Sequence, residues 1–152
     1  MSRLRRNTAL AAIVVVAVSG FEGLRLAAYR DPVGIPTVCF GETKGIRLGM
    51  KFTRPECEAM LTESLVKHEM GMVKCLNNPE LLPDGAYGAF VSFTYNVGVG
   101  AFCKSTAARL INAGNVKGAC DQLLRWDRAA GIRLPGLTKR RKAERELCLE
   151  GL

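Results

Sequence analysis

The chain begins with a basic stretch followed by a long apolar run. Arg3, Arg5 and Arg6 precede residues 9–18, which are apolar without interruption, and no acidic residue occurs before Glu22. A basic start followed by an apolar segment is typical of an export signal whose N-terminus stays in the cytoplasm. The pattern therefore predicts a signal or anchor segment over residues 1–20.

This segment is short for a membrane anchor. Even from Thr8 to Phe21 it would extend only about 21 Å as a helix, against about 30 Å of hydrocarbon core. Three interpretations follow: a signal peptide cleaved near Ser19, an uncleaved signal anchor, or a buried N-terminal helix. A buried helix leaves the basic start unexplained. Cleavage would remove the helix expected to position Glu22, so we favour the uncleaved segment.

From residue 29 to residue 50, glycine and proline residues separate short segments with β propensity. This pattern predicts a small antiparallel sheet with tight turns. Thr53 and Glu56 then form a capping box that starts a helix. Apolar and small residues follow on one face of this helix at helical spacing: Cys57, Met60, Leu61, Ser64, Leu65 and His68.

The second half of the chain predicts a series of helices. Residues 77–85 are expected to form a loop, and the largely apolar residues 86–97 the buried central helix. Further segments complete the expected series: a helix capped by Ser105 or Thr106 and ending at Asn112, a helix ending at Trp126, a loop over 127–135, and a basic helix over 139–149 capped by Thr138. The fold class is α+β, mostly helical, with a small antiparallel sheet near its start.

Length and charge narrow the functional classes. The 152 residues suit one domain, and the net charge of +8 indicates a polyanionic partner. Nucleic acid, a membrane surface and an acidic wall polymer are the candidates. The chain has no zinc-finger spacing and no RNA-binding aromatic motif, which disfavours nucleic acid.

Six cysteines are spread over the chain: Cys39, Cys57, Cys75, Cys103, Cys120 and Cys148. No pair has the C-x-x-C spacing of a zinc or thioredoxin-type site, so no metal site is predicted. An even number of widely spaced cysteines indicates disulfides formed outside the cytoplasm, although buried free thiols would fit the same pattern. The sequence does not choose a pairing.

Two acids and a hydroxyl form the candidate catalytic group. Glu22 precedes a run of helix formers over residues 24–28, Asp31 precedes a proline-containing turn, and Thr37 begins a β-branched stretch. Two carboxyl groups in different environments are what glycoside hydrolysis requires. By itself this spacing is common. On the local pattern alone, a solvated helix charge at Glu22 and a turn-capping aspartate at Asp31 are the better explanations.

Several segments together resemble the phage-type lysozymes of glycoside hydrolase family 24. The matching residues cover nearly the whole chain from Phe21 onward: 21–26, 28–29, Asp31, Gly34, Thr37, Gly41, Thr43, 93–98, Phe102, 105–106, 110–112, 118–123, 125–126, 136–137, 140–141, 143–145 and 147–148. The resemblance implies a lysozyme-like two-lobe domain over residues 21–152.

This resemblance assigns an activity and roles. The substrate would be peptidoglycan, cut at the β-1,4 bond between N-acetylmuramic acid and N-acetylglucosamine. Glu22 would be the general acid, in an apolar setting supplied by Phe21, Leu24 and Leu26. Asp31 would activate water or stabilise the transition state, and Thr37 would hold the water. The family also implies an inverting reaction by a monomer, with no cofactor, although residue spacing does not distinguish inversion from retention.

The start of the chain is similar to that of signal-anchor-release (SAR) endolysins. In that class the export signal tethers the enzyme, inactive, to the host inner membrane on its periplasmic side. Collapse of the membrane potential, caused by a holin-type depolariser, then frees it into the periplasm. No cysteine precedes Cys39, so the resemblance implies release by refolding of residues 1–20 into the first helix.

One departure and several alternatives accompany this resemblance. The chain has Glu42 where the family commonly has histidine, which adds a third carboxyl group and could change the pH dependence. His68 and Trp126 are expected to pack, and residues 139–142 could be no more than a solvated basic face. The rival classes are a wall-binding or membrane-inserting toxin module, a disulfide-stapled structural domain, and a lytic transglycosylase.

Overall fold

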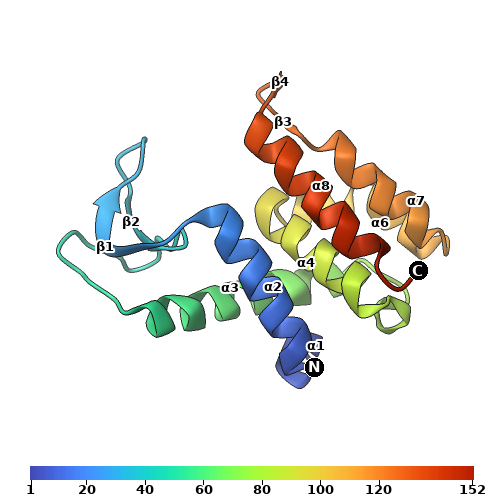
Figure 1. Ribbon diagram of the computed structural model, residues 1–152, viewed down its shortest axis with the longest axis horizontal. Helices are drawn as coiled ribbons and strands as arrows, with labels where there is room; N and C mark the ends of the chain where they lie inside the picture. The colour runs from blue at the N-terminus through green and yellow to red at the C-terminus, as the bar shows by residue number, and fades with distance from the viewer. The chain divides into compact units, whose positions relative to one another are not determined.

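The computed structural model describes residues 1–152 as a mostly helical protein with two small antiparallel ladders (Figure 1). The elements in chain order are α1 (Arg3–Arg6), α2 (Thr8–Glu22), β1 (Arg25–Arg30), β2 (Pro36–Cys39), α3 (Arg54–Lys74), η1 (Pro79–Leu81), α4 (Asp84–Val97), α5 (Val99–Cys103), α6 (Thr106–Asn112), α7 (Val116–Gln122), η2 (Leu123–Arg125), β3 (Arg128–Ala129), β4 (Ile132–Arg133) and α8 (Pro135–Leu149). The predicted α+β class is confirmed.

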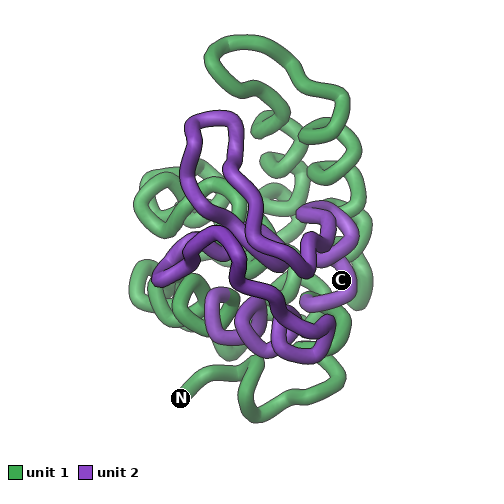
Figure 2. The backbone as a smooth tube through the Cα atoms, turned by 90° about the vertical axis from the view of Figure 1, so that its left-hand side faces the viewer, with its two compact units in different colours: residues 1–14, 65–152 green, residues 15–64 purple.

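The chain divides into two compact units (Figure 2). Unit 1 contains residues 1–14 and 65–152, and unit 2 contains residues 15–64. The boundary between the units falls within two helices, α2 and α3. Each of these helices therefore contributes one half to each unit.

Unit 1 is built around α4. Residues 86–94 of this helix are all buried, which confirms the predicted central helix, and its most extensive packing is against α8. The rings of Phe90 and Phe93 both contact Phe102, and Trp126 meets Phe93 edge-on at 5.2 Å between ring centroids. His68 likewise packs edge-on against Tyr95. Both His68 and Trp126 therefore pack against aromatic side chains, as expected.

The boundaries of the other helices in unit 1 differ from the prediction in three places. Residues 99–103 form α5, although the glycines around them predict only a helix end. The expected loop over 77–85 contains the short helix η1 and the first turn of α4. The helix expected to reach Trp126 becomes a 3₁₀ turn after Gln122. Its N-cap is Asn115, and Ser105 caps α6 as predicted.

The expected loop over 127–135 is a hairpin, and α8 begins one turn earlier than predicted. Strands β3 and β4 pair through a tight turn in which Ala130 and Gly131 both have positive φ, as a two-residue hairpin turn requires. Proline occupies the first position of α8, where its missing N–H has no cost. The Thr138 hydroxyl donates to Asp127 at 3.0 Å instead of capping the helix.

The basic stretch at residues 139–142 is only half solvated. Arg140 and Arg141 are buried together with Glu144. The Arg141 guanidinium donates to Glu144, to Asn96 and to the carbonyl oxygen of Trp126. Burial raises the pKa of the Glu144 carboxyl, and the neighbouring Arg141 opposes this shift. The alternative in which residues 139–142 are no more than a solvated basic face is therefore wrong for Arg140 and Arg141.

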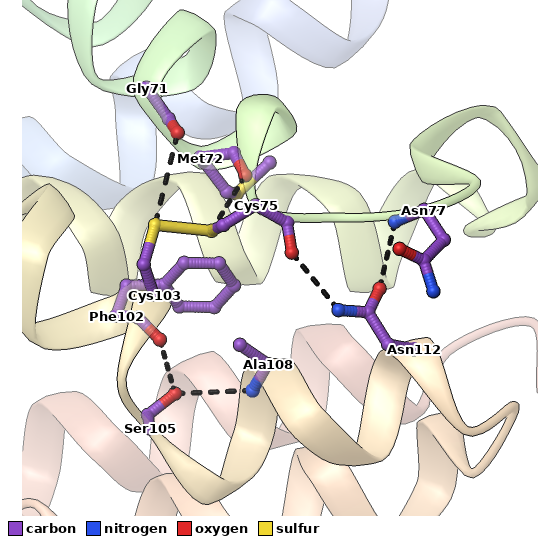
Figure 3. Close-up of a disulfide and its surroundings, with 9 residues drawn as sticks. All are labelled: Gly71, Met72, Cys75, Asn77, Phe102, Cys103, Ser105, Ala108 and Asn112. Carbon is purple, nitrogen blue, oxygen red and sulfur yellow. Dashed lines mark hydrogen bonds between the residues drawn. A yellow bond between two sulfur atoms is a disulfide. The ribbon is translucent and has the colours of Figure 1, made fainter.

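All six cysteines are paired, and each disulfide lies within one unit. Cys39–Cys57 belongs to unit 2, whereas Cys75–Cys103 and Cys120–Cys148 belong to unit 1. Figure 3 shows Cys75–Cys103, beside which the Asn112 side chain donates to the carbonyl oxygen of Cys75 and accepts from the N–H of Asn77. The predicted disulfides are thus present, and the structure supplies the pairing that sequence left open.

Unit 2 holds the β1–β2 ladder and the first half of α3. The capping box is confirmed, because Thr53 N–H donates to Glu56 and Glu56 N–H donates to the Thr53 hydroxyl. The ladder begins at Arg25, so the run of helix formers over residues 24–28 is mostly strand. Pairing with β2 decides this conformation over local helix propensity.

Candidate functional site

Glu22 is the last residue of α2. Gly23, with φ of +75°, follows it and donates its N–H to the carbonyl oxygen of Ser19 at 3.2 Å, which terminates the helix. Glu22 lies at the protein surface, and Leu26 is 45% exposed. The expected apolar enclosure of Glu22 is therefore wrong, because the helix ends at the surface and the following strand leaves Leu26 in solvent.

Asp31 is held rigidly in the turn between β1 and β2. Its Oδ1 accepts hydrogen bonds from the backbone N–H groups of Val33 and Ile35, each at 2.9 Å. Its own N–H donates to the carbonyl oxygen of Ile35 at 3.0 Å, and its carbonyl oxygen accepts from Gly34 at 2.8 Å. Both bonds to the carboxylate use one oxygen. The second oxygen, Oδ2, is therefore available to a ligand or water.

Thr37 is held by the same short segment. It lies in β2 opposite Tyr29 of β1, and its hydroxyl donates to the carbonyl oxygen of Ile35 at 2.9 Å. Ile35 thus binds the Asp31 carboxylate through its N–H and the Thr37 hydroxyl through its carbonyl oxygen. Because the Thr37 proton is committed to Ile35, its oxygen can only accept a hydrogen bond from a further molecule.

The three predicted residues come from consecutive elements of unit 2. Glu22 ends a helix, Asp31 follows the first strand, and Thr37 lies in the second strand. One exposed carboxyl can exchange protons with bound substrate, while a fixed carboxylate and a fixed hydroxyl acceptor can orient one water. This set of groups suits acid-assisted hydrolysis.

Glu42 has a partner that the sequence does not indicate. Both of its carboxylate oxygens accept from the Ser64 hydroxyl of α3, at 3.0 and 3.2 Å. Glu42 is also bonded to the β2 strand through its backbone. Its N–H donates to the carbonyl oxygen of Val38, and its carbonyl oxygen accepts from the N–H of Val38. The Cys39–Cys57 disulfide provides a second connection from this strand to α3. The strand carrying Thr37 is therefore attached to α3 at two points.

A basic groove lies on unit 1, between the β3–β4 hairpin and α8. Its volume is about 710 Å³, and its lining includes the cations Arg133, Lys139 and Lys142 together with Pro135 and Ala143. One acid, Glu146, also lines it. The excess of positive charge provides a surface that suits an acidic polymer.

None of the helices combines the length and the apolar content needed to cross a membrane.

The fold and the sequence have close counterparts among phage lytic enzymes. The endolysin from Escherichia coli O157:H7 phage FAHEc1 superposes with a TM-score of 0.81 at 32% identity, covering 91% of this chain and 92% of that chain. The SAR-endolysin of bacteriophage PS119 is 42% identical, covering 99% of this chain and 98% of the relative. The SAR-endolysin of enterobacteria phage P21 is 43% identical, covering 94% and 88%.

These similarities define a lysozyme-type glycoside hydrolase. The model of the phage lysozyme family matches residues 19–144, a range that contains Glu22, Asp31 and Thr37. The chain belongs to the phage lysozyme family. The protein is accordingly a muramidase that lyses peptidoglycan as a phage endolysin.

Proposed function

We propose that Glu22, Asp31 and Thr37 together hydrolyse the β-1,4 bond between N-acetylmuramic acid and N-acetylglucosamine. The observation that carries this assignment is the shared attachment of Asp31 and Thr37 to Ile35. This attachment leaves two hydrogen-bond acceptors, Asp31 Oδ2 in the turn after β1 and Thr37 Oγ1 in the β2 strand.

In the proposed reaction Glu22 protonates the glycosidic oxygen as the bond to the anomeric carbon breaks. A water donates one hydrogen to Asp31 Oδ2 and the other to Thr37 Oγ1, so that its lone pair attacks the anomeric carbon. Asp31 takes the proton that the water loses. An attack on the face opposite the leaving group inverts the anomeric configuration, and an α product measured by NMR would agree with this course.

The decisive variant is Glu22→Gln, which keeps the shape of the side chain and removes its acidic proton. We expect the rate of wall degradation to fall by about 10²- to 10⁴-fold, the usual contribution of a general acid. Clearing of outer-membrane-permeabilised cells measures this rate. Glu58→Gln is the matched control, because Glu58 is a partly exposed acid of unit 2 whose carboxylate pairs with Arg54. Unreduced activity of Glu22→Gln would refute the assignment, and anhydro-sugar products would show a transglycosylase.

We also propose that residues 1–20 tether the protein, inactive, to the host inner membrane before it acts in the periplasm as a monomer. The relatives named SAR-endolysins support this proposal. So does the apolar character of α2, which has no charged residue between Thr8 and Phe21. Because Glu22 is the last residue of that helix, the acid could reach its place in the folded protein only after the helix leaves the bilayer.

Fractionation of exporting cells tests the tether. The protein should sediment with the inner membrane in energised cells, and a holin or a chemical depolariser should move active enzyme to the soluble periplasmic fraction. Enzyme that is soluble and active before depolarisation would contradict the tether. N-terminal sequencing of the released enzyme should find residues 1–20 intact.

A further inference from the structure

A buried carboxylate in unit 1 takes no part in the proposed reaction. Glu69 lies in α3 with 0% of its surface exposed. A buried carboxylate is unfavourable unless hydrogen-bond donors surround it. The identity of its donors therefore shows what the site has to bind for unit 1 to be stable.

Four hydrogen bonds reach the Glu69 carboxylate. Oε1 accepts from the backbone N–H of Arg3 at 2.6 Å, from the N–H of Leu4 at 3.1 Å and from the Tyr87 hydroxyl at 2.7 Å. Oε2 accepts from the Ser2 hydroxyl. Three of the four donors thus come from residues 2–4, and only Tyr87 belongs to the rest of unit 1.

The surroundings of Glu69 complement the same residues. The Arg3 guanidinium lies 4.4 Å from the centre of the Tyr87 ring and pairs with Asp84 at 2.6 Å. Leu4, the next residue, is buried. Arg6 pairs with Glu80 at 3.0 Å and Asn7 donates to Asp84 at 3.1 Å. An acidic surface with a buried acceptor therefore meets a basic segment with several donors.

No disulfide involves residues 1–38, because all three bridges join cysteines from Cys39 onward. Residues 2–4 can consequently arrive at Glu69 or leave it without any exchange of disulfides. The noncovalent contacts of the segment decide whether it is bound.

We infer that Glu69, together with Tyr87 and Asp84, is a binding site for the chain's own residues 2–4, and that its occupation holds the released enzyme in the soluble form. The inference rests on the proposed tethering of residues 1–20. In the tethered protein Arg3, Arg5 and Arg6 lie across the bilayer from residues 65–152, so Glu69 keeps Tyr87 as its only donor. After release the Ser2 hydroxyl and two backbone N–H groups complete its hydrogen bonding.

Ser2 offers an isosteric pair of variants that tests the site. The Ser2 hydroxyl accepts from the N–H of Arg5 at 3.1 Å and so caps α1, while its proton goes to Glu69. Asparagine and aspartate both cap helices well. Ser2→Asn can still donate to Glu69, whereas Ser2→Asp places a second carboxylate against it.

The measurement is hydrogen exchange of the Arg3 and Leu4 amides in the purified, soluble, full-length protein. We expect the wild type and Ser2→Asn to protect these amides. Ser2→Asp should exchange them about tenfold faster or more, as expected for the loss of at least one charged hydrogen bond. Equal protection in Ser2→Asp and the wild type would overturn the inference.

A second variant changes the Glu69 carboxylate itself. Glu69→Gln replaces one acceptor oxygen by a donor, and Glu58→Gln on the same helix is its matched control. We expect faster exchange at Arg3 and Leu4 in Glu69→Gln alone, with the near-ultraviolet circular dichroism of the wild type retained. If Glu69→Gln loses that spectrum, the Ser2 pair decides the question, because the Ser2 variants leave the Glu69 carboxylate unchanged.

A membrane assay separates this inference from the proposed tether. After depolarisation, Ser2→Asp should return to vesicles of E. coli lipid several-fold more than Ser2→Asn does. A wild type that is never tethered, but whose residues 2–4 are protected as expected, would refute the tether and leave the binding site intact. If the wild type is tethered but the two variants return to the vesicles equally, the proposed binding of residues 2–4 at Glu69 would be refuted and the tether would stand.

Discussion

Val14 of α2 packs directly against Gly88 of α4. A Cβ atom built on Gly88 would lie 3.0 Å from Val14 Cγ2 and 3.2 Å from Leu10 Cδ1. The two helices therefore approach more closely than a larger residue would allow, and both Leu10 and Val14 are buried. In the folded protein, Leu10 and Val14 of the apolar run that resembles an export segment are therefore part of the core of unit 1.

Replacement of Gly88 tests this close approach. We expect Gly88→Ala to lower the free energy of unfolding by about 1 to 2 kcal/mol, because the added methyl group overpacks the contact with Leu10 and Val14. Gly100→Ala in α5 is the control. A Cβ there meets nothing within 4 Å, so this variant should be neutral or up to about 1 kcal/mol more stable. Urea unfolding measures both, and equal stability of the two variants would contradict the packing.

Asp31→Asn should separate the charge of Asp31 from its structural role. The amide oxygen can still accept from Val33 and Ile35, so the free energy of unfolding should change by less than about 0.5 kcal/mol. Removal of the negative charge should lower kcat on purified peptidoglycan by about 10²- to 10⁴-fold. A variant that is strongly destabilised, or one that is fully active, would disagree with the proposed role.

Thr37 should matter through its oxygen. Thr37→Val keeps the buried volume and removes the acceptor for water, while Thr37→Ser keeps it. We expect kcat to fall by about tenfold or more in Thr37→Val and by much less in Thr37→Ser, since one hydrogen bond of about 1.4 kcal/mol corresponds to a factor of ten. A larger loss in Thr37→Ser than in Thr37→Val would instead indicate a packing role for the methyl group, because only serine lacks it.

The three disulfides should differ in their reactivity. Cys39, Cys57, Cys120 and Cys148 are fully buried, whereas Cys75 and Cys103 are only partly buried. Thiol–disulfide exchange requires access to a sulfur atom. Mild reduction followed by alkylation and mass spectrometry should therefore label Cys75 and Cys103 first. Earlier labelling of Cys39 and Cys57 would show that unit 2 opens before unit 1.

The burial of Tyr87 should make the free energy of unfolding depend on pH in alkaline solution. Burial, with a further contribution from the hydrogen bond to Glu69, raises the pKa of the Tyr87 hydroxyl far above its ordinary value. The folded protein thus favours the neutral phenol, and the resulting stability is complete below about pH 10, the ordinary pKa of tyrosine, and declines above it. In urea unfolding, the advantage of the wild type over Tyr87→Phe should shrink between pH 8 and pH 11. A constant advantage would argue against burial of the hydroxyl.

Local features of the fold could be predicted because they depend on neighbours a few residues apart. The capping box at Thr53 and Glu56, the Ser105 cap and the apolar helix of residues 86–94 are all of this kind. The errors fall where the pairing of two strands overrides the local preference of each segment. Residues 25–30 form a strand because they pair with β2, and the loop over 127–135 is a hairpin that α8 follows at once.

The features of the candidate site also fall into those that the local sequence predicts and those that only the fold decides. The places of Glu22 at the end of a helix and of Asp31 in a proline-containing turn can be predicted from the residues themselves, whereas the catalytic roles of Glu22, Asp31 and Thr37 rest on the family resemblance. The attachment of Asp31 and Thr37 to Ile35, and the exposure of Glu22, depend on how the turn folds back on the strand. No periodic or motif signal indicates that Ser64 bonds Glu42.

The sequence by itself determined the chemical groups of this protein: an apolar segment that ends at an acid, a glycosidase-like set of side chains, six cysteines and a basic surface. Only the tertiary structure decided their partners. The Glu69 carboxylate accepts hydrogen bonds from residues 2–4, and Arg141 is buried beside Asn96 and Glu144. Each cysteine forms a disulfide with one particular partner. The reason is physical: helix periodicity and caps act over about four residues, whereas buried charges and disulfides are satisfied by groups that the whole chain has to bring together.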